Sequence, residues 1–204
     1  MDSDNHETPY AGLSPEIVLD AIDASGLLSD GRLLALNSYE NRVYQVGLED
    51  GRFVVAKFYR PGRWSDAAIE EEHAFACELA AAELPMVAPL AVDSATLLRF
   101  EGFRYALYPR RGGRAPSLES ADQLEWMGRL IARMHGIGAR QPFQSRQRLD
   151  RQVFITAPAQ AVLKSGLLPA HLADAYRDAV ARVDAAVVAR FDNVGMTRTL
   201  RLHG

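Results

Sequence analysis

The chain of 204 residues contains one cysteine and two lysines, and it has no long uncharged apolar run. A single cysteine, Cys77, cannot form an intrachain disulfide, which favours a reducing, cytoplasmic compartment. No segment approaches the roughly 18 apolar residues of a membrane helix. The first residues also lack the basic end and the apolar core of a signal peptide. We therefore predict a globular protein that is neither secreted nor embedded in a membrane.

The scarcity of lysine contrasts with an abundance of arginine. Of 23 basic residues, only Lys57 and Lys164 are lysines, so a lysine that is present suggests a specific role. Residues 1–98 contain 17 acidic and 6 basic side chains, whereas residues 99–204 contain 9 acidic and 17 basic ones. The arginines of the second half are not interleaved with aromatic residues that could stack on bases. Nucleic-acid binding is therefore not expected.

The first half of the chain has the pattern of a helix followed by a hairpin. Ser14 and Pro15 begin an amphipathic segment that predicts a helix, which ends near Gly26. Two runs rich in β-branched and aromatic residues, 33–48 and 52–59, predict strands. The second pair of strands is joined at Glu49-Asp50-Gly51, which is a strong hairpin signal.

A second helix and further strands are predicted next. Ser65 can cap a helix whose inward stripe contains Ile69, Ala76, Leu79, Glu72 and His73. A carboxylate on that stripe needs a partner inside the protein. Residues 89–109 predict short strands separated at Ser94 and at Glu101-Gly102. Residues 109–117, with two prolines, two glycines and three arginines, are the best candidate for a domain boundary.

The second half is predicted to be mainly helical. Ser120 and Gln123 form a candidate capping box, and the helix that follows is expected to end at Gly136. Its predicted buried stripe consists of Leu124, Met127, Ile131 and Met134. Residues 138–151 predict a basic loop, residues 171–191 predict a further amphipathic helix, and residues 197–204 predict a short strand.

Lys57 is the first candidate for chemistry. It lies in a predicted strand with two apolar faces, so its ammonium group either reaches solvent or meets a negative charge in a cleft. Kinase-type nucleotide sites use a lysine on the third strand to bind phosphates, and a glutamate from the next helix to orient that lysine. Glu72 has this position, with Glu71 as the alternative if the helical phase differs by one residue. A lysine at the exposed edge of the sheet is the structural alternative.

The loop between the first two strands is the second candidate. Kinases fold a glycine-rich loop over the phosphates at this point, but residues 36–44 contain no glycine. Ser38 and Asn41 can still offer hydroxyl, amide and backbone donors to phosphate oxygens. The same residues also suit an ordinary polar turn.

Several segments of the chain resemble, in their order, the stress response kinase A family. Its members are bacterial serine/threonine kinases of the aminoglycoside-phosphotransferase-like superfamily. The segments are LNSYENRVYQV, RFVVAKFYRPGRW, IEEEHAF, RYALYP, GGR, GRLIARMHGIG and LRLHG. The resemblance, from about Leu13 to the end, implies an α+β, protein-kinase-like fold with two lobes. It implies a complete small ATP-binding lobe (13–107), a hinge (108–116) and an incomplete helical large lobe (117–204). The polar residues 1–12, which carry no periodic pattern, are expected to form a flexible tail.

The resemblance also implies which residues contact or position ATP: Ser38, Asn41, Lys57, Glu72, Tyr108 and Arg110. Lys57 would bind phosphate, and Glu72 would orient the Lys57 side chain. Backbone groups of residues 108–110 would pair with the adenine edge. His135, in the last turn of its helix, is expected to be structural. Cys77 is expected to be a small buried residue.

In this family a strand that ends in His-Gly leads into the catalytic loop, whose aspartate is the base and whose asparagine helps to bind Mg²⁺. This chain ends at His203-Gly204. The resemblance therefore implies a fragment that is inactive alone, and that forms the ATP-binding part of a stress-response serine/threonine kinase using Mg²⁺ and an unidentified protein substrate. The alternatives are a phosphotransferase for small alcohols, such as an aminoglycoside, choline or homoserine, and a non-catalytic nucleotide-binding module.

Overall fold

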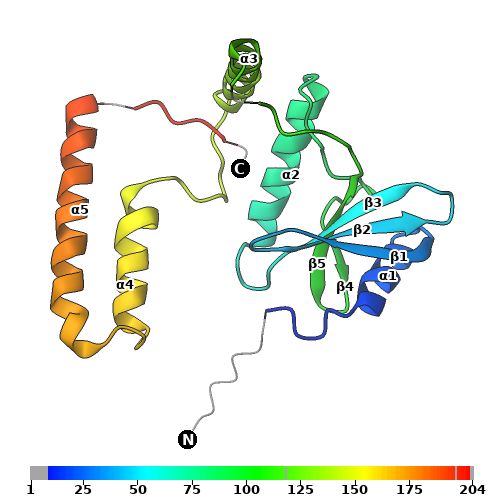
Figure 1. Ribbon diagram of the computed structural model, residues 1–204, viewed down its shortest axis with the longest axis horizontal. Coiled ribbons are helices and arrows are strands. Elements are labelled where there is room, and N and C mark those ends of the chain that lie inside the picture. Colours follow the sequence, from blue (N-terminus) through cyan, green and yellow to red (C-terminus); the bar gives the residue numbers. More distant parts are fainter. Residues whose placement is uncertain (1–8, 118, 196, 203–204) are drawn as a thin grey trace, which may run out of the picture. The chain divides into compact units, whose positions relative to one another are not determined.

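The computed structural model describes residues 9–117, 119–195 and 197–202, and it confirms the expected α+β class. Residues 1–8 of the predicted tail and the His203-Gly204 end lie outside the described residues. The chain divides by its internal contacts into two units, residues 1–145 with 201–204, and residues 146–200. Figure 1 shows the elements of both units, and each unit is described by itself. The lobe boundaries expected from the sequence stay a prediction.

The first unit is built on an antiparallel sheet with the order β1-β2-β3-β5-β4. Its strands are β1 (Ser29–Leu36), β2 (Arg42–Leu48), β3 (Phe53–Phe58), β4 (Leu98–Phe100) and β5 (Phe103–Pro109). The predicted hairpin is confirmed, because Gly51 has a φ of 80° in the turn that joins β2 to β3. The strand predicted before Ser94 is wrong. Asp93 and Ser94 both have positive φ, which limits pairing there to one bridge between Val92 and Ala95.

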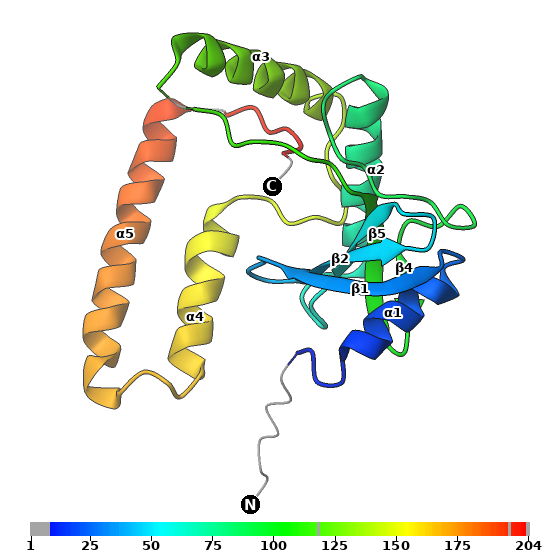
Figure 2. The same ribbon diagram turned by 45° about the vertical axis from the view of Figure 1, so that its right-hand side comes forward.

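Two helices, α1 (Pro15–Ala24) and α2 (Asp66–Ala81), lie on opposite faces of this sheet (Figure 2). The predicted caps are confirmed, since Ser14 and Ser65 each accept a backbone hydrogen bond from the first turn. The core beneath α1 consists of Val18, Ala21, Ile22, Val46, Leu48, Val54, Ala56, Phe58, Tyr105 and Leu107. Burying a large apolar side chain contributes about 1.5–3 kcal/mol. This core therefore holds the sheet against α1. Because side chains alternate along each strand, the remaining strand residues face α2.

The inward stripe of α2 is confirmed, with Ile69, Ala76 and Leu79 all buried. The expectation of a buried Cys77 is wrong, because this side chain is exposed. The reason is helical phase, since Cys77 lies about 100° round the helix from Ala76 and away from the sheet.

The third helix, α3 (Ala121–Gly138), extends two residues beyond the predicted stop. Its capping box is only half formed. Ser120 Oγ accepts from the Gln123 backbone at 3.4 Å, whereas Gln123 Oε1 accepts from the Ser117 backbone at 2.6 Å. The side chain of Gln123 therefore orders the chain before the helix and does not bond to Ser120.

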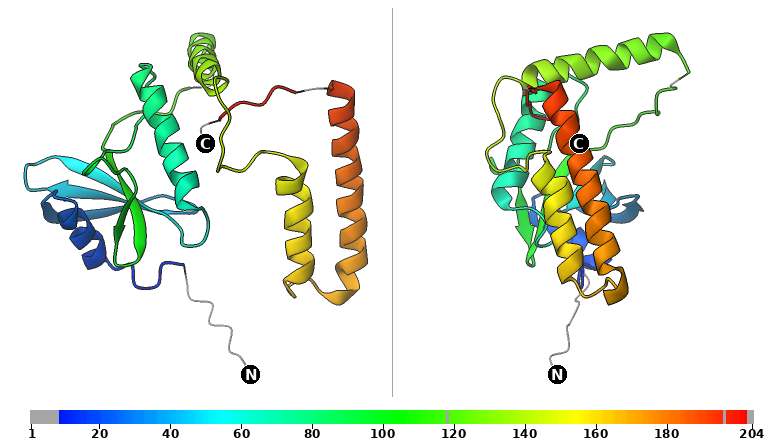
Figure 3. Two further views of the ribbon diagram at one scale, coloured as in Figure 1. Left: turned by 180° about the vertical axis from the view of Figure 1, so that it is seen from behind. Right: turned by 90° about the vertical axis from the view of Figure 1, so that its left-hand side faces the viewer.

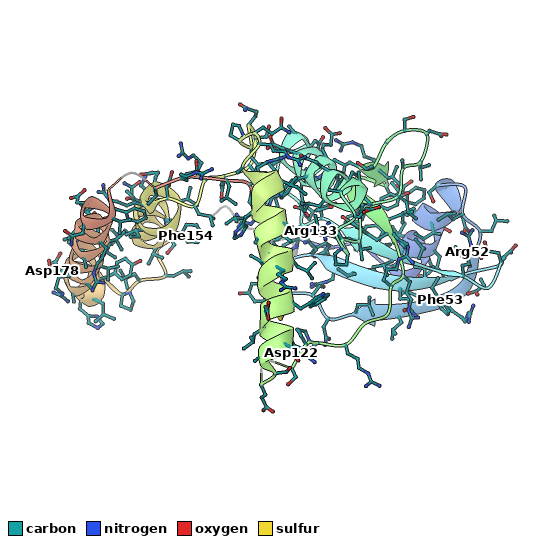
Figure 4. All side chains as sticks on the ribbon, turned by 90° about the horizontal axis from the view of Figure 1, so that it is seen from above. Arg52, Phe53, Asp122, Arg133, Phe154 and Asp178 are labelled. Atoms are coloured by element: carbon teal, nitrogen blue, oxygen red, sulfur yellow. The ribbon has the colours of Figure 1, made fainter. Side chains whose placement is uncertain are left out.

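The predicted buried stripe of α3 is wrong at Leu124 and Ile131, whereas Met127 and Met134 are half-buried. Leu124 and Ile131 are 48% and 45% exposed. Figure 4 shows side chains projecting from α3 along most of the helix, and it labels Arg133, which donates to the Ala82 carbonyl oxygen at 3.0 Å. Full burial is reached at the carboxyl end, where Ile137 joins a cluster with residues of α2 and Met134 packs against it.

The second unit contains two helices side by side, α4 (Ala157–Lys164) and α5 (Ala173–Val194) (Figure 3). The predicted loop is confirmed between residues 139 and 150, and α5 confirms the helix predicted at 171–191. A π-helical turn, Gln152–Thr156, leads into α4, which the sequence did not predict, and a 3₁₀ turn, Ala170–Leu172, precedes α5. No helix among the described residues of either unit has both the length and the apolar character needed to cross a membrane.

The strand predicted at the end of the chain is wrong for the described residues, 197–202, which form no strand. The backbone N–H of Arg201 instead donates to the Gly138 carbonyl oxygen of α3 at 3.1 Å. A Cβ at Gly138 would lie 2.3 Å from the Arg201 carbonyl oxygen, so this close approach requires glycine. The segment pairs with a helix end, and therefore it does not extend the sheet.

Candidate functional site

The centre of the candidate site is an ion pair between Lys57 of β3 and Glu72 of α2. The Lys57 Nζ atom lies 3.2 Å from Glu72 Oε1, and the two side chains are 24% and 21% exposed. β3 has neighbours on both sides, with Val43 of β2 and Ala106 of β5 opposite Lys57. Lys57 is therefore not at an edge of the sheet, and that structural alternative is wrong.

Glu71, the other candidate partner, has a different function in the fold. Its two carboxylate oxygens accept backbone hydrogen bonds from Gln144 and Ser145, at 2.5 Å and 2.8 Å. Because these residues lie in the loop after α3, Glu71 connects α2 to the middle of that loop. The helical phase that places Glu72 toward the sheet is confirmed.

The ammonium group of Lys57 is held in place by its neighbours but stays accessible to a ligand. It lies 4.8 Å from the centroid of the Tyr59 ring, and a cation near an aromatic face is stabilised by the ring quadrupole. An ammonium group has three donors, and Glu72 accepts one hydrogen bond from it. About a quarter of the side chain remains open to solvent, so an anionic ligand can reach a lysine that the protein already holds in place.

Ser38 and Asn41 lie in the loop between β1 and β2, where their side chains bond within the protein. Ser38 Oγ donates to the Asn41 carbonyl oxygen at 2.7 Å, and Asn41 Oδ1 accepts from the Arg60 backbone at 3.2 Å. This is the polar turn that the sequence allowed. A contact of either residue with phosphate stays a prediction.

Tyr108 and Arg110 lie at the end of β5 and just beyond it. The Tyr108 hydroxyl is 3.2 Å from that of Tyr59, and burial raises its pKa to about 12, so the phenol is neutral at physiological pH. Arg110 is exposed in the segment of residues 110–117, which has no helix or strand among its described residues. The structure therefore brings Tyr108 to the face of the sheet that carries Lys57, and leaves the Arg110 side chain in solvent.

A buried histidine completes this face and was not predicted as a site residue. His73 Nε2 lies 2.6 Å from the Tyr59 hydroxyl, and Nδ1 lies 2.9 Å from Thr96 Oγ1. Burial lowers its pKa to about 4, with a smaller lowering by Lys57, so His73 is neutral at pH 7. Its position on the inward stripe was visible in the sequence. Its partners come from two other segments, and no local pattern identifies them.

Metal binding requires several ligating side chains close together. The described part of the chain has no group of three or more histidine, cysteine, aspartate or glutamate side chains that could hold a metal ion. We therefore assign no Mg²⁺ ligand among the described residues.

Known proteins resemble this chain in sequence. Residues 32–204 match the phosphotransferase enzyme family, abbreviated APH. The chain is 41% identical, over 197 residues, to a protein named serine/threonine protein kinase RdoA from Salmonella typhimurium (strain LT2), and 39% identical, over 200 residues, to stress response kinase A from Escherichia coli (strain K12). These alignments cover 96% and 98% of this chain, but 59% and 60% of the relatives. The chain thus spans about three fifths of their length.

A solved structure shares the fold. It is the amicoumacin kinase hAmiN in complex with AMP-PNP, Ca²⁺ and Ami, with a TM-score of 0.63 and 16% sequence identity. The likeness covers 90% of this chain and 55% of that protein. At this identity the comparison shows a common kinase-like fold.

Proposed function

The chain belongs to the phosphotransferase enzyme family, and from this membership we propose that it forms the ATP-binding part of a kinase that phosphorylates protein hydroxyl groups. The Lys57–Glu72 ion pair is the observation that carries the proposal. In kinases such a pair fixes a lysine against the α- and β-phosphates of ATP. The likeness of about 40% to relatives named serine/threonine or stress response kinases supports a protein substrate and a function in stress response.

The proposed chemistry of this part of the protein is positioning and charge neutralisation. Lys57 contributes a point charge toward the phosphates, and Glu72 and the Tyr59 ring keep that charge in place. Ser38 and Asn41 line the phosphate side, and the backbone of residues 108–110 pairs with the adenine edge. A compact ammonium group suits phosphate oxygens whose position changes during transfer, because its three donors rotate freely.

The remaining parts of the reaction are a catalytic base and bound Mg²⁺, which kinases use for phosphoryl transfer. The chain spans about three fifths of the relatives' length, and the resemblance assigns neither the base nor the metal ligands to its residues. We infer that the 204-residue chain binds nucleotide and does not turn it over. A cytoplasmic location, supported by the single cysteine, belongs to the same proposal.

Calorimetric titration of the 204-residue chain tests the nucleotide site. Lys57→Ala is expected to weaken ATP at least tenfold, on the order of the 1.4 kcal/mol or more of a lost charge-assisted contact, and to leave adenosine unchanged. Lys57→Arg is expected to weaken ATP binding similarly, because a planar guanidinium group does not replace a compact ammonium charge. Lys164→Ala, at the exposed end of α4, is the matched control. An equal loss of ATP and adenosine affinity in Lys57→Ala would contradict the phosphate role.

A further inference from the structure

We propose that Glu40 is a positioning residue that holds the glycine-free loop between β1 and β2, residues 37–41, in the place where it covers the phosphates of ATP. It does so by binding Arg63 and Trp64 in the β3–α2 segment, residues 59–65. This inference rests on the proposed nucleotide site. It assigns a function to Glu40 and to the segment RPGRW, which the site itself does not use.

Both oxygens of the Glu40 carboxylate are engaged. Oε1 accepts from the indole Nε1 of Trp64 at 3.1 Å, and Oε2 accepts from Nε of Arg63 at 3.0 Å. The Arg63 guanidinium also lies 4.8 Å from the centroid of the Trp64 ring. Two donors of different shape, stacked on each other, therefore fix the direction of one carboxylate.

The backbone around Glu40 is held as well. Its carbonyl oxygen accepts from the Tyr10 hydroxyl at 2.8 Å. The next residue, Asn41, accepts from the Arg60 backbone at 3.2 Å, and Ser38 closes the loop internally. The loop is thus attached to the β3–α2 segment by neighbouring residues, both of which bond to residues within 60–64.

This attachment sets the position of the loop relative to Lys57. The β3–α2 segment begins at Tyr59, two residues after Lys57, and the Tyr59 ring lies beside the Lys57 ammonium group. A loop fastened to this segment therefore keeps a fixed place with respect to the phosphate-binding charge. None of residues 37–41 has a positive φ, so this loop does not use the backbone conformations open to a glycine-rich loop. Holding a loop in its bound position before the ligand arrives lowers the entropic cost of binding.

Because these side chains are partly exposed, their loss should affect the position of the loop more than the stability of the fold. The Glu40 and Arg63 side chains are 28% and 45% exposed, and ion pairs near the surface contribute little to folding. A variant at Glu40 should therefore fold normally, and the change should appear in phosphate binding.

The test is titration of ATP and adenosine into the 204-residue chain and its variants, with thermal unfolding as a check of folding. Glu40→Ala is expected to weaken ATP about fivefold to tenfold, as for one or two lost hydrogen bonds, with adenosine unchanged. Glu40→Gln keeps an acceptor for Trp64, so its ATP affinity is expected to lie between those of the parent and Glu40→Ala. Glu49→Gln, an exposed glutamate in the β2–β3 hairpin, is the matched control and should bind both ligands as the parent does.

Tryptophan emission gives a second readout that a purely structural contact would not change. In a Trp126→Phe background Trp64 is the remaining tryptophan, and ATP is expected to shift its emission while adenosine does not. Glu40→Ala should abolish this shift. Unchanged ATP affinity and an unchanged shift in Glu40→Ala would overturn the inference, whereas the loss in Lys57→Ala would leave the proposed function standing. If Lys57→Ala weakens ATP and adenosine equally, the proposed function fails and the inference fails with it.

Discussion

Arg201 forms an ion pair with Glu78 of α2, with 2.8 Å between Nη1 and Oε2. The guanidinium lies 4.3 Å from the centroid of the Phe75 ring, and its Nη2 donates to the Ile137 carbonyl oxygen at 3.1 Å. Arg201 is only 4% exposed. One arginine near the end of the chain therefore binds both α2 and the carboxyl end of α3.

This ion pair should contribute measurably to stability. Removing one partner of a buried pair costs about 3–5 kcal/mol, and we expect about 2–3 kcal/mol for Glu78→Ala because its side chain is 29% exposed. Glu70→Ala, on the exposed side of the same helix, should change the free energy of unfolding by less than about 0.5 kcal/mol. Urea unfolding measures both. Equal effects of the two substitutions would show that Arg201 does not depend on Glu78.

Two glycines of α3 should respond in opposite ways to substitution by alanine. A Cβ at Gly136 would meet no neighbouring group within 4 Å, so Gly136→Ala should stabilise the helix by up to about 1 kcal/mol. At Gly138 the Cβ would meet the Arg201 backbone oxygen at 2.3 Å, so Gly138→Ala should destabilise by about 1–3 kcal/mol. Thermal unfolding of the two variants checks this. The prediction fails if Gly138→Ala is as stable as Gly136→Ala.

His73 should make stability depend on pH. Its pKa is about 4 in the folded chain against an ordinary value of 6.5, because burial among Tyr59, Tyr108 and Thr96 disfavours the charged ring more than Glu72 favours it. The unfolded chain therefore binds more protons between pH 6.5 and 4. Stability from this group is complete above pH 6.5 and decreases by up to about 3 kcal/mol as the pH falls to 4.

The comparison of the parent with His73→Gln isolates this contribution. The variant carries no ionisable ring, so its free energy of unfolding should fall less steeply over the same pH range. Denaturant unfolding at about pH 7, 5.5 and 4.5 provides the slopes. Parallel slopes would mean that His73 does not titrate as its burial requires.

The exposed apolar surface of α3 should promote self-association of the 204-residue chain. Leu124 and Ile131, which lie on one face of the helix, are 48% and 45% exposed, and grouped apolar side chains favour contact between molecules. The double substitution Leu124→Gln with Ile131→Gln should lower the apparent mass at high concentration by light scattering. Arg129→Gln, on another side of the helix, should have no such effect. Equal masses for the parent and the double variant would contradict this.

Features that depend on neighbouring residues were determined by the sequence. The caps at Ser14 and Ser65 and the Asp50-Gly51 turn are local, because each needs only groups within a few residues of itself. The choice of Glu72 over Glu71 followed from the helical phase of α2, whose apolar stripe marks the face toward the sheet. Fold class and family followed from the order of several such segments.

Burial and long-range partners were decided only by the tertiary structure. Ile131 has the pattern of a buried residue and is exposed, because a helical face is buried only where another element covers it. Arg201 looked like part of a strand and is a buried bridge to Glu78, which is far away in the sequence. The same holds for Glu40 and Trp64, which approach only after β2 and β3 have paired. No local pattern encodes such contacts, since their free energy arises when packing removes both partners from water.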